Sequence, residues 1–498
     1  MNHEKRKQFI TIVIFVAILA ILIAVVWRTS GTTTFVRTAL SGLTLGSLFF
    51  MVSAGLTLIF GLMHVLNFAH GSMFMLGAYI GWQFYTNPTF VFGIAPLIIA
   101  FATGLQFLTV IKPRLTQLNL SESLQNLLPR LAWVLVIILV VLAILNFDIL
   151  GLANTAMVAV TTVTESNPLA ELSPQEPLAR FWLRPFFLLL GGFLAAVAVS
   201  KPGNKKEYVA AEHTTRNWLL IGGLIVATIL LTVFREAWSE AILLMNGNLR
   251  FVLALFVATG FGLLCGMFIE VLLIRPLYTR SFFIVLMTLG ISFVIKETIQ
   301  FLWTPLAYKM VRPPLFAAPG KAETVADWLL NSNATLNIFG VTFPTYRLFI
   351  ILLGFLMFIF ITLLMTKTRL GMVIRAGVQD PEMVEALGIN VRSVFTFVFA
   401  LGIAMAALGG IGAAPFIPVQ PLMGDQYQMQ GFITVVIGGM GSYVGAFIGA
   451  LTLGLARAFG DYYALKWSLS TAVAEASTVI IMVIVLLVKP SGLFGKKE

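Results

Sequence analysis

Residues 42–81 read GLTLGSLFFMVSAGLTLIFGLMHVLNFAHGSMFMLGAYIG, and this stretch sets the main problem that the fold has to solve. It is apolar enough to cross a membrane, yet Asn67, His70 and Gly71 interrupt it. A broken helix at membrane depth leaves backbone N–H and C=O groups unpaired, which costs free energy unless protein or water satisfies them. The stretch therefore predicts a broken membrane helix with a functional reason for the break.

The composition of the whole chain indicates its class. Of the 498 residues, 59% are hydrophobic and 11% are charged, and the mean hydropathy is +0.96. A soluble protein would carry more charge, and a transmembrane barrel would show short alternating strands instead of long apolar runs. We therefore predict an all-α polytopic membrane protein with about 12–14 membrane-embedded helices, some of them broken or re-entrant.

The apolar runs give the expected positions of the spans. The run at 8–27 is interpreted as a retained membrane anchor, because no small-residue cleavage site follows it. Residues 429–458 contain closely spaced glycines and predict a helical hairpin with a tight turn, or two helices in close contact. The other spans are expected near 36–61, 66–85, 90–111, 131–147, 181–199, 217–235, 249–274, 281–301, 346–366, 394–415 and 470–488.

The charges report topology rather than a nucleic-acid partner. The net charge is +11, but the basic residues are scattered among the loops between spans. Their distribution favours cytoplasmic termini and places the segment 366–393 inside and the segment 302–345 outside. The outer segment is either a docking surface or a connecting loop.

Catalytic and metal-binding motifs are not found in the sequence. There is no GxxxxGKS/T phosphate loop and no HExxH motif, and the single cysteine, Cys265, cannot form an intrachain disulfide or a cysteine cluster. We therefore expect no cofactor, no metal and no enzymatic activity.

The segment 366–393, TKTRLGMVIRAGVQDPEMVEALGINVRS, encodes a short capped helix. Asp380 is an N-cap, Pro381 occupies the first helical position and Gly388 ends the turn. No bilayer-length apolar run surrounds this helix, so either the rest of the chain or a partner has to cover its apolar side chains. Those side chains are Met383, Val384 and Leu387.

Four blocks, in order, resemble one family. They are similar to branched-chain amino acid ABC transporter permeases of the LivH type. The blocks are residues 42–81, IEVLLIRPLYTRSFFIVLMTLGISFVIKE at 269–297, the segment 366–393, and ITVVIGGMGSYVGAFIGALTLGL at 433–455 with VLLVKPSGLFG at 485–495. The resemblance covers about 35–86 and 249–494. It implies a permease subunit in the bacterial cytoplasmic membrane that imports branched-chain or related hydrophobic amino acids.

The resemblance also implies partners. They are ABC ATPase subunits, a second homologous permease subunit that is LivM-like, an extracytoplasmic solute-binding protein and the lipid bilayer. The ATPase is expected to contact the 366–393 segment, which would couple ATP hydrolysis to alternating access. The expected coupling residues are Arg375, Asp380, Pro381, Glu382, Met383, Glu385, Leu387 and Gly388.

The chain departs from the compact family pattern in two places. Residues 1–34 add an N-terminal helix, and 88–248 insert about four further spans between the core segments 35–87 and 249–498. An even number of inserted spans keeps both core segments in their usual orientation. The insertion is therefore expected to be peripheral to the transport core.

The broken helix is the expected solute pathway. A free half-helix N-terminus can bind a carboxylate through its N–H donors, and an asparagine side chain can both donate and accept. Alternatively, Asn67 and His70 simply cap the break. Gly61 and Gly71 are expected to end the flanking helices. The pathway residues are Gly61, Asn67, Phe68, His70 and Gly71.

Ionisable residues within the spans need partners, because burial of an unpaired charge is costly. Glu270 lies within reach of Arg275, while Lys296, Glu297 and Glu475 are each expected to find a partner on another helix. Ion pairs that hold helices together are the first interpretation, and a proton relay is the alternative.

Three other functions stay open. A urea or short-amide permease of the same family would keep the mechanism but change the solute. An ion-coupled secondary transporter would use Lys296, Glu297 and Glu475 as coupling sites and need no ATPase. A membrane-embedded enzyme is the third option, although no nucleophile and base pairing is visible.

Overall fold

The computed structural model describes residues 28, 31–63, 65–115, 118, 121–161, 177–200, 214–278, 280–470, 472–489 and 492–494. The predicted span at 8–27 lies outside these residues. The chain divides into two compact units, of which unit 1 comprises residues 1–82 and 247–498 and unit 2 comprises residues 83–246.

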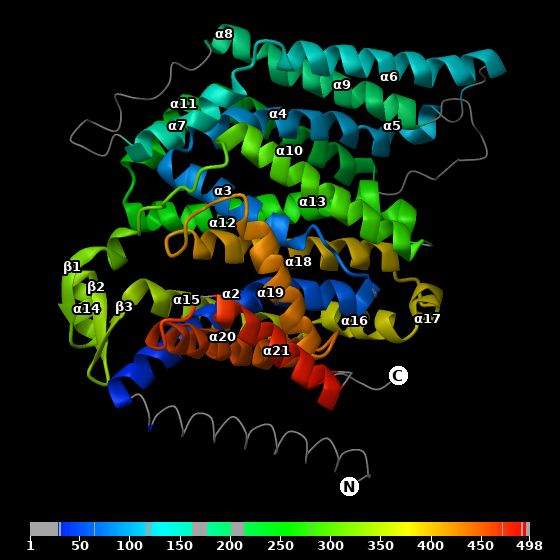
Figure 1. The fold of residues 1–498 in the computed structure, drawn as a ribbon. Helices are drawn as coiled ribbons and strands as arrows, with labels where there is room; N and C mark the ends of the chain where they lie inside the picture. The colour runs from blue at the N-terminus through cyan, green and yellow to red at the C-terminus, as the bar shows by residue number, and fades with distance from the viewer. Residues whose placement is uncertain are drawn as a thin grey trace. The chain divides into compact units, whose positions relative to one another are not determined.

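Unit 1 contains most of the long helices and a small sheet (Figure 1). Its helices are α2 (Thr32–Met63), α3 (His70–Thr86, which continues into unit 2), α12 (Gly247–Ile269), the π-helix η2 (Glu270–Ile274), the 3₁₀-helices η3 (Arg275–Leu277) and η4 (Pro314–Phe316), α13 (Ser281–Trp303), α14 (Val325–Asn331), α15 (Thr345–Lys367), α16 (Arg369–Gln379), α17 (Pro381–Ala386), α18 (Val391–Ala413), α19 (Met423–Gly438), α20 (Tyr443–Lys466) and α21 (Ala472–Val488). Its strands are β1 (Ala318–Ala322), β2 (Asn333–Ile338) and β3 (Val341–Pro344).

The regular elements in the described part of unit 2 are all helices. Its helices are α4 (Thr89–Gln106), α5 (Leu108–Leu115), α6 (Glu122–Ile144), α7 (Ile149–Thr161), α8 (Leu178–Phe181), α9 (Leu183–Val199), α10 (Thr214–Val233) and α11 (Arg235–Leu244). Helix α4 packs against α9 and α10, and α9 also packs against α6. Buried Arg184 of α9 donates to the carbonyl oxygens of Ala143 and Leu145, at 2.6 and 3.0 Å, where α6 ends.

The predicted fold class is confirmed. Among the described residues, nine helices are long and apolar enough to cross a bilayer, and α9 and α21 include shorter apolar segments. The glycine-rich stretch forms the predicted hairpin, in which α19 and α20 are joined by a tight turn with Gly439 and Gly441 at positive φ angles of 99° and 81°. The protein is therefore a multi-pass helical membrane protein.

The core of unit 1 is built around α2. This helix is buried along most of its length and packs against α18, α19 and α20. Its contact with α20 is close because neither Gly46 nor Gly454 carries a side chain: a Cβ on Gly454 would lie 2.3 Å from the backbone nitrogen of Gly46. Small residues allow such close helix contacts where water provides no hydrophobic driving force.

The segment 302–345 contains structure that the sequence did not predict. Strand β1 pairs with β2 in parallel and β2 pairs with β3 antiparallel, with α14 as the crossover. The turn between β2 and β3 consists of Phe339 and Gly340, both at positive φ, as two-residue hairpins require. Below the sheet, buried Phe316 packs on Tyr346 of α15.

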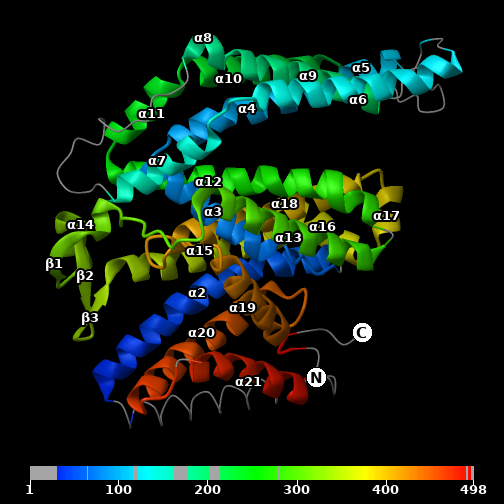
Figure 2. The same cartoon turned by 45° about the horizontal axis from the view of Figure 1, so that its top comes forward.

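The sheet and α17 occupy opposite ends of unit 1. In Figures 1 and 2 the sheet lies at one end of α15, while α16 and α17 lie at the other. Helix α15 is long and apolar enough to cross a bilayer, so the sheet and α17 lie at opposite ends of a candidate membrane span.

Candidate functional site

The break between α2 and α3 is present as predicted. Helix α2 ends at Met63, α3 begins at His70, and residues 65–69 are not helical. The prediction that glycines end the two helices is wrong: Gly61 lies inside α2 and Gly71 lies in the first turn of α3. A Cβ on Gly71 would lie 2.3 Å from the carbonyl oxygen of Gly424, and one on Gly61 would lie 3.2 Å from the Cα of Gly441. These glycines therefore permit close packing rather than helix termination.

The backbone donors at the start of α3 are already bonded within the chain. The N–H of Phe68 donates to Oγ1 of Thr288 at 3.2 Å, and the N–H of Ala69 donates to Oδ1 of Asn67 at 3.0 Å. The N–H of Gly71 donates to Oε1 of Gln428. The expectation of free N–H donors is therefore wrong for these three groups, because side chains from α13, from α19 and from the break itself supply the acceptors.

Asn67 and His70 cap the break from inside. Both are buried, the carbonyl oxygen of Asn67 accepts from Nε2 of Gln428 at 3.2 Å, and Nε2 of His70 lies 2.9 Å from the carbonyl oxygen of Val52. A carbonyl can only accept, so the proton of His70 lies on Nε2. Within the described residues, Asn67 Nδ2 and His70 Nδ1 are buried without a hydrogen-bond partner. The hydrogen bonding at the break is therefore incomplete at these two atoms.

A polar stripe on α13 faces the break. Thr288, Ser292 and Lys296 recur at every fourth position, so they lie on one face of the helix. Thr288 bonds to the backbone of the break, as described above, and Oγ of Ser292 lies 2.7 Å from Oγ of Ser72. Sequence reasoning singled out only Lys296, although this four-residue spacing could have identified the other two.

The ion pairs of the spans are largely as expected. Lys296 Nζ lies 2.6 Å from Asp425 Oδ2 on α19, and Glu475 Oε1 lies 3.2 Å from Arg457 Nη2 on α20. The prediction that Lys296 and Glu475 pair with other helices is therefore confirmed. For Glu297 it is wrong: the side chain is exposed, and the described part of the chain provides no partner for it.

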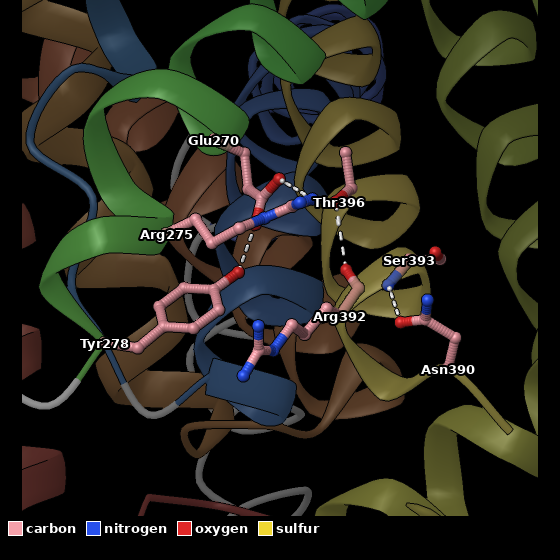
Figure 3. A network of polar contacts seen from close by, with 7 residues as sticks. All are labelled: Glu270, Arg275, Tyr278, Asn390, Arg392, Ser393 and Thr396. Carbon is pink, nitrogen blue, oxygen red and sulfur yellow. Dashed lines mark hydrogen bonds and ion pairs between the residues drawn. The ribbon is translucent and has the colours of Figure 1, made fainter. Parts of the chain in front are cut away.

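Glu270 anchors a polar network at the end of α12 (Figure 3). Arg275 Nη2 donates to Glu270 Oε2 at 3.2 Å, which confirms the expected pair, and to Thr396 Oγ1 of α18 at 2.5 Å. The Tyr278 hydroxyl also donates to Glu270. Burial and this hydrogen bond raise the pKa of Tyr278, so its hydroxyl keeps the proton that it donates.

This network joins two distant parts of the chain. It connects the π-helix η2 to the first turns of α18, which begins shortly after α17. Pro276 lacks an N–H and cannot continue the α-helical hydrogen bonds, which accounts for the irregular end of α12. The network therefore links the end of α12 to the start of α18 through Arg275 and Thr396.

The segment that contains α17 is held by its own neighbours. The N–H of Gly371 donates to Thr368 Oγ1 at 3.1 Å at the start of α16, and the N–H of Met383 donates to Asp380 Oδ1 at 2.9 Å at the start of α17. Arg375 donates to the carbonyl oxygen of Met365 near the end of α15. Gly388 has a φ of +81°, as expected for the residue that ends the turn.

The apolar side chains of α17 point in two directions. Val384 is buried, whereas Met383 and Leu387 are 61% and 74% exposed and Glu385 is exposed beside them. Of the three apolar side chains, Val384 is therefore covered by its own chain, whereas Met383 and Leu387 are not covered by the described residues. The side chains of Pro381 and Glu382 lie outside the described residues.

A set of apolar helices around a broken, polar-lined helix is an arrangement that membrane transporters use for solutes. Residues 216–488 match the family model described as "Branched-chain amino acid transport system / permease component". The chain therefore belongs to this family of permease components.

The similar curated proteins agree with that assignment. The chain is 30% identical over 250 residues to the high-affinity branched-chain amino acid transport system permease protein LivH of Salmonella typhimurium and of Escherichia coli K12, covering 50% of this chain and 74% of each relative. It is 31% identical over 161 residues to permease protein BraD of Pseudomonas aeruginosa, covering 32% of this chain and 50% of that protein. No solved structure matches the chain.

Proposed function

We propose that the chain is a permease subunit of an ABC importer for branched-chain or related hydrophobic amino acids, located in the bacterial cytoplasmic membrane. Membership of the permease family is the observation that carries the proposal. The names of the LivH and BraD relatives supply the solute class.

In this proposal, α17 is the docking segment for a separate ATPase. The sequence contains no phosphate loop, so ATP hydrolysis belongs to another subunit. Met383 lies on α17, whose N-terminus Asp380 caps, and Leu387 directly follows the helix; both side chains are exposed at the end of unit 1 opposite the sheet. Two exposed apolar side chains beside Glu385 suit a partner groove with an apolar floor and a polar rim.

Solute passes along the break in this proposal. Opening the path requires Gly71 and Asn67 to exchange their bonds with Gln428, which couples solute passage to movement of α19 against α3. The second permease subunit would complete the path. The sheet at the outer end is the proposed contact for the extracytoplasmic solute-binding protein.

The ATPase contact can be tested with a charge on α17. Leu387→Arg should abolish both copurification of the ATPase and ATP-dependent uptake of radiolabelled leucine in proteoliposomes, because it places a cation in an apolar contact. Leu330→Arg is the matched control: Leu330 is 84% exposed on α14 at the opposite end of unit 1, and the variant should keep the ATPase.

Two results would contradict the proposal. Persistence of both ATPase association and uptake in the Leu387→Arg variant would show that α17 is not the coupling contact. Uptake that needs no nucleotide and collapses on proton uncoupling would instead identify an ion-coupled transporter.

A further inference from the structure

The Lys296–Asp425 ion pair joins the candidate membrane span α13 to the first turn of α19 without being fully buried. The side chains are 21% and 55% exposed, and their charged atoms are 2.6 Å apart. Lys296 is seven residues before the end of α13, which corresponds to about 10 Å along the helix. Charged side chains at such depth face water or protein rather than lipid, and they often mark solute pathways.

This ion pair adjoins the broken helix. On α13, Lys296 lies one turn beyond Ser292, which contacts Ser72 of α3. On α19, Asp425 lies about one turn before Gln428, which bonds to Gly71 and Asn67. The two charges therefore lie beside the proposed path on the two helices that hold the break closed.

Apolar side chains flank the charges. Phe293 precedes Lys296 by three residues and is 64% exposed, and Met429 follows Asp425 by four residues and is 61% exposed. Residues three or four apart share a helix face, so each charge has an exposed apolar neighbour. Methionine and aromatic side chains adapt well to apolar ligands of varied shape.

We propose that Lys296 and Asp425 bind the two charges of a zwitterionic α-amino acid, with Phe293 and Met429 beside its apolar side chain. In this inference, which rests on the proposed function, the solute carboxylate replaces Asp425 at Lys296 and the solute ammonium replaces Lys296 at Asp425. One ion pair separates and two ion pairs form. Because the permease pair and the solute are each neutral, no uncompensated charge remains at membrane depth.

The same charge balance favours zwitterionic solutes over solutes with one charge or none. A monocarboxylate would pair with Lys296 but leave Asp425 without a cation, and a simple amine would do the reverse. An uncharged amide would separate the ion pair without replacing either charge. Each of these solutes meets an energetic penalty that a zwitterion avoids, because desolvated charges are stable only when paired.

The test uses the complete importer in proteoliposomes with radiolabelled leucine. Lys296→Met/Asp425→Leu should lower the uptake rate about tenfold or more, since two charge-assisted contacts to the solute are lost. Replacing both charges together avoids a buried unpaired ion, so the complex should assemble normally. Yield and size-exclusion profile check the assembly.

The Arg457–Glu475 pair provides the matched control. It also joins two helices of unit 1, at 3.2 Å, with side chains that are 19% and 67% exposed. Because Arg457 also pairs with Asp461 of its own helix at 3.3 Å, the control variant is Glu475→Gln, which breaks the interhelical pair and leaves Arg457 with Asp461. It should leave leucine uptake within about twofold of the wild type. If both ion pairs only brace helices, breaking either one should change uptake to a similar extent.

The binding preference for leucine over analogues that lack one charge gives a second readout. An ion pair that only holds helices together would not affect this preference. Direct binding of radiolabelled leucine to the purified complex is competed with leucine, with 4-methylpentanoate, which lacks the ammonium, and with 3-methylbutylamine, which lacks the carboxylate. Wild type should prefer leucine to either analogue. Asp425→Asn should lose the preference over 4-methylpentanoate, and Lys296→Gln the preference over the amine.

Each result decides the matter. Uptake within twofold for Lys296→Met/Asp425→Leu, together with unchanged analogue preferences, overturns the site while wild-type leucine uptake upholds the proposed function. If that double variant does not assemble, the analogue preferences of the single variants decide. A wild-type importer that hydrolyses ATP but transports no amino acid overturns both the solute assignment and the site.

Discussion

The break between α2 and α3 and the segment α16–α17 are two short interruptions that are stabilised in different ways. At the break, Gln428 and Thr288, each more than 200 positions away in the sequence, accept from the N–H groups of Gly71 and Phe68, while Ala69 donates to the nearby Asn67. At α17, Asp380 accepts from Met383, three residues further along. The break is buried, whereas α17 exposes Met383 and Leu387.

The two segments differ in the substitutions and the changes in their surroundings that they can tolerate. A buried element held by distant partners changes only when several helices move together, and substitutions there meet close-packed backbone. A locally capped helix keeps its shape when its surroundings change, so it can bind a partner and move as one body. In the proposed function, the break forms the closed solute path and α17 is the docking segment for the ATPase.

Gly71→Ala should show the largest difference in stability between a substitution at the break and one in the α16–α17 segment. The new Cβ would lie 2.3 Å from the carbonyl oxygen of Gly424 and 2.5 Å from Cβ of Gln428, so helices have to shift. We expect a loss of at least about 3 kcal/mol in unfolding free energy, measured by thermal unfolding of the purified protein. Gly377→Ala on α16 is the control, because its Cβ would meet only Leu62 Cδ1, at 3.9 Å. If the two variants were equally stable, the break would not be more closely packed than the α16–α17 segment.

Gln428→Leu should have the next largest effect. It removes the acceptor for the N–H of Gly71 and the donor to the carbonyl oxygen of Asn67, leaving buried groups unpaired. We expect about 2 kcal/mol of destabilisation in the same unfolding measurement. Gln426→Leu, at an exposed position on the same helix, should be neutral. A neutral Gln428→Leu would mean that water replaces both hydrogen bonds at the break.

Asp380→Ala should have the smallest effect on stability. Loss of the N-cap costs α17 about 1 kcal/mol, so its amide hydrogens should exchange faster while global unfolding stays unchanged. ATPase copurification should weaken. Thr324→Ala removes an equivalent cap from α14, whose Asp327 N–H donates to Thr324 at 3.1 Å, and should leave the ATPase bound. Equal ATPase binding in both variants would show that the α17 cap is irrelevant to docking.

Features with local sequence signals could be predicted. The span positions follow from continuous apolar runs, and Asp380–Pro381 with Gly388 marks α17 because capping depends on neighbouring residues. The position of the break is also readable, since Asn67 and His70 interrupt an apolar run.

Features that depend on contacts between distant segments could not be predicted. Gln428 and Asp425 lie in a stretch that reads as an ordinary helix start, and nothing local shows that they meet α3 and α13. The strands of the sheet are short, and the pairing of β1 with β2 crosses α14. Gly61 and Gly71 were misinterpreted because a glycine needed for close packing looks the same in sequence as one that ends a helix.

The sealed break has a consequence for the idle protein. A resting importer must not short-circuit the electrochemical gradient of its membrane. Because the N–H groups of Phe68, Ala69 and Gly71 bond to side chains, these positions need no column of water to solvate them. A break whose donors are satisfied in this way can lie in the bilayer interior without water at these three positions.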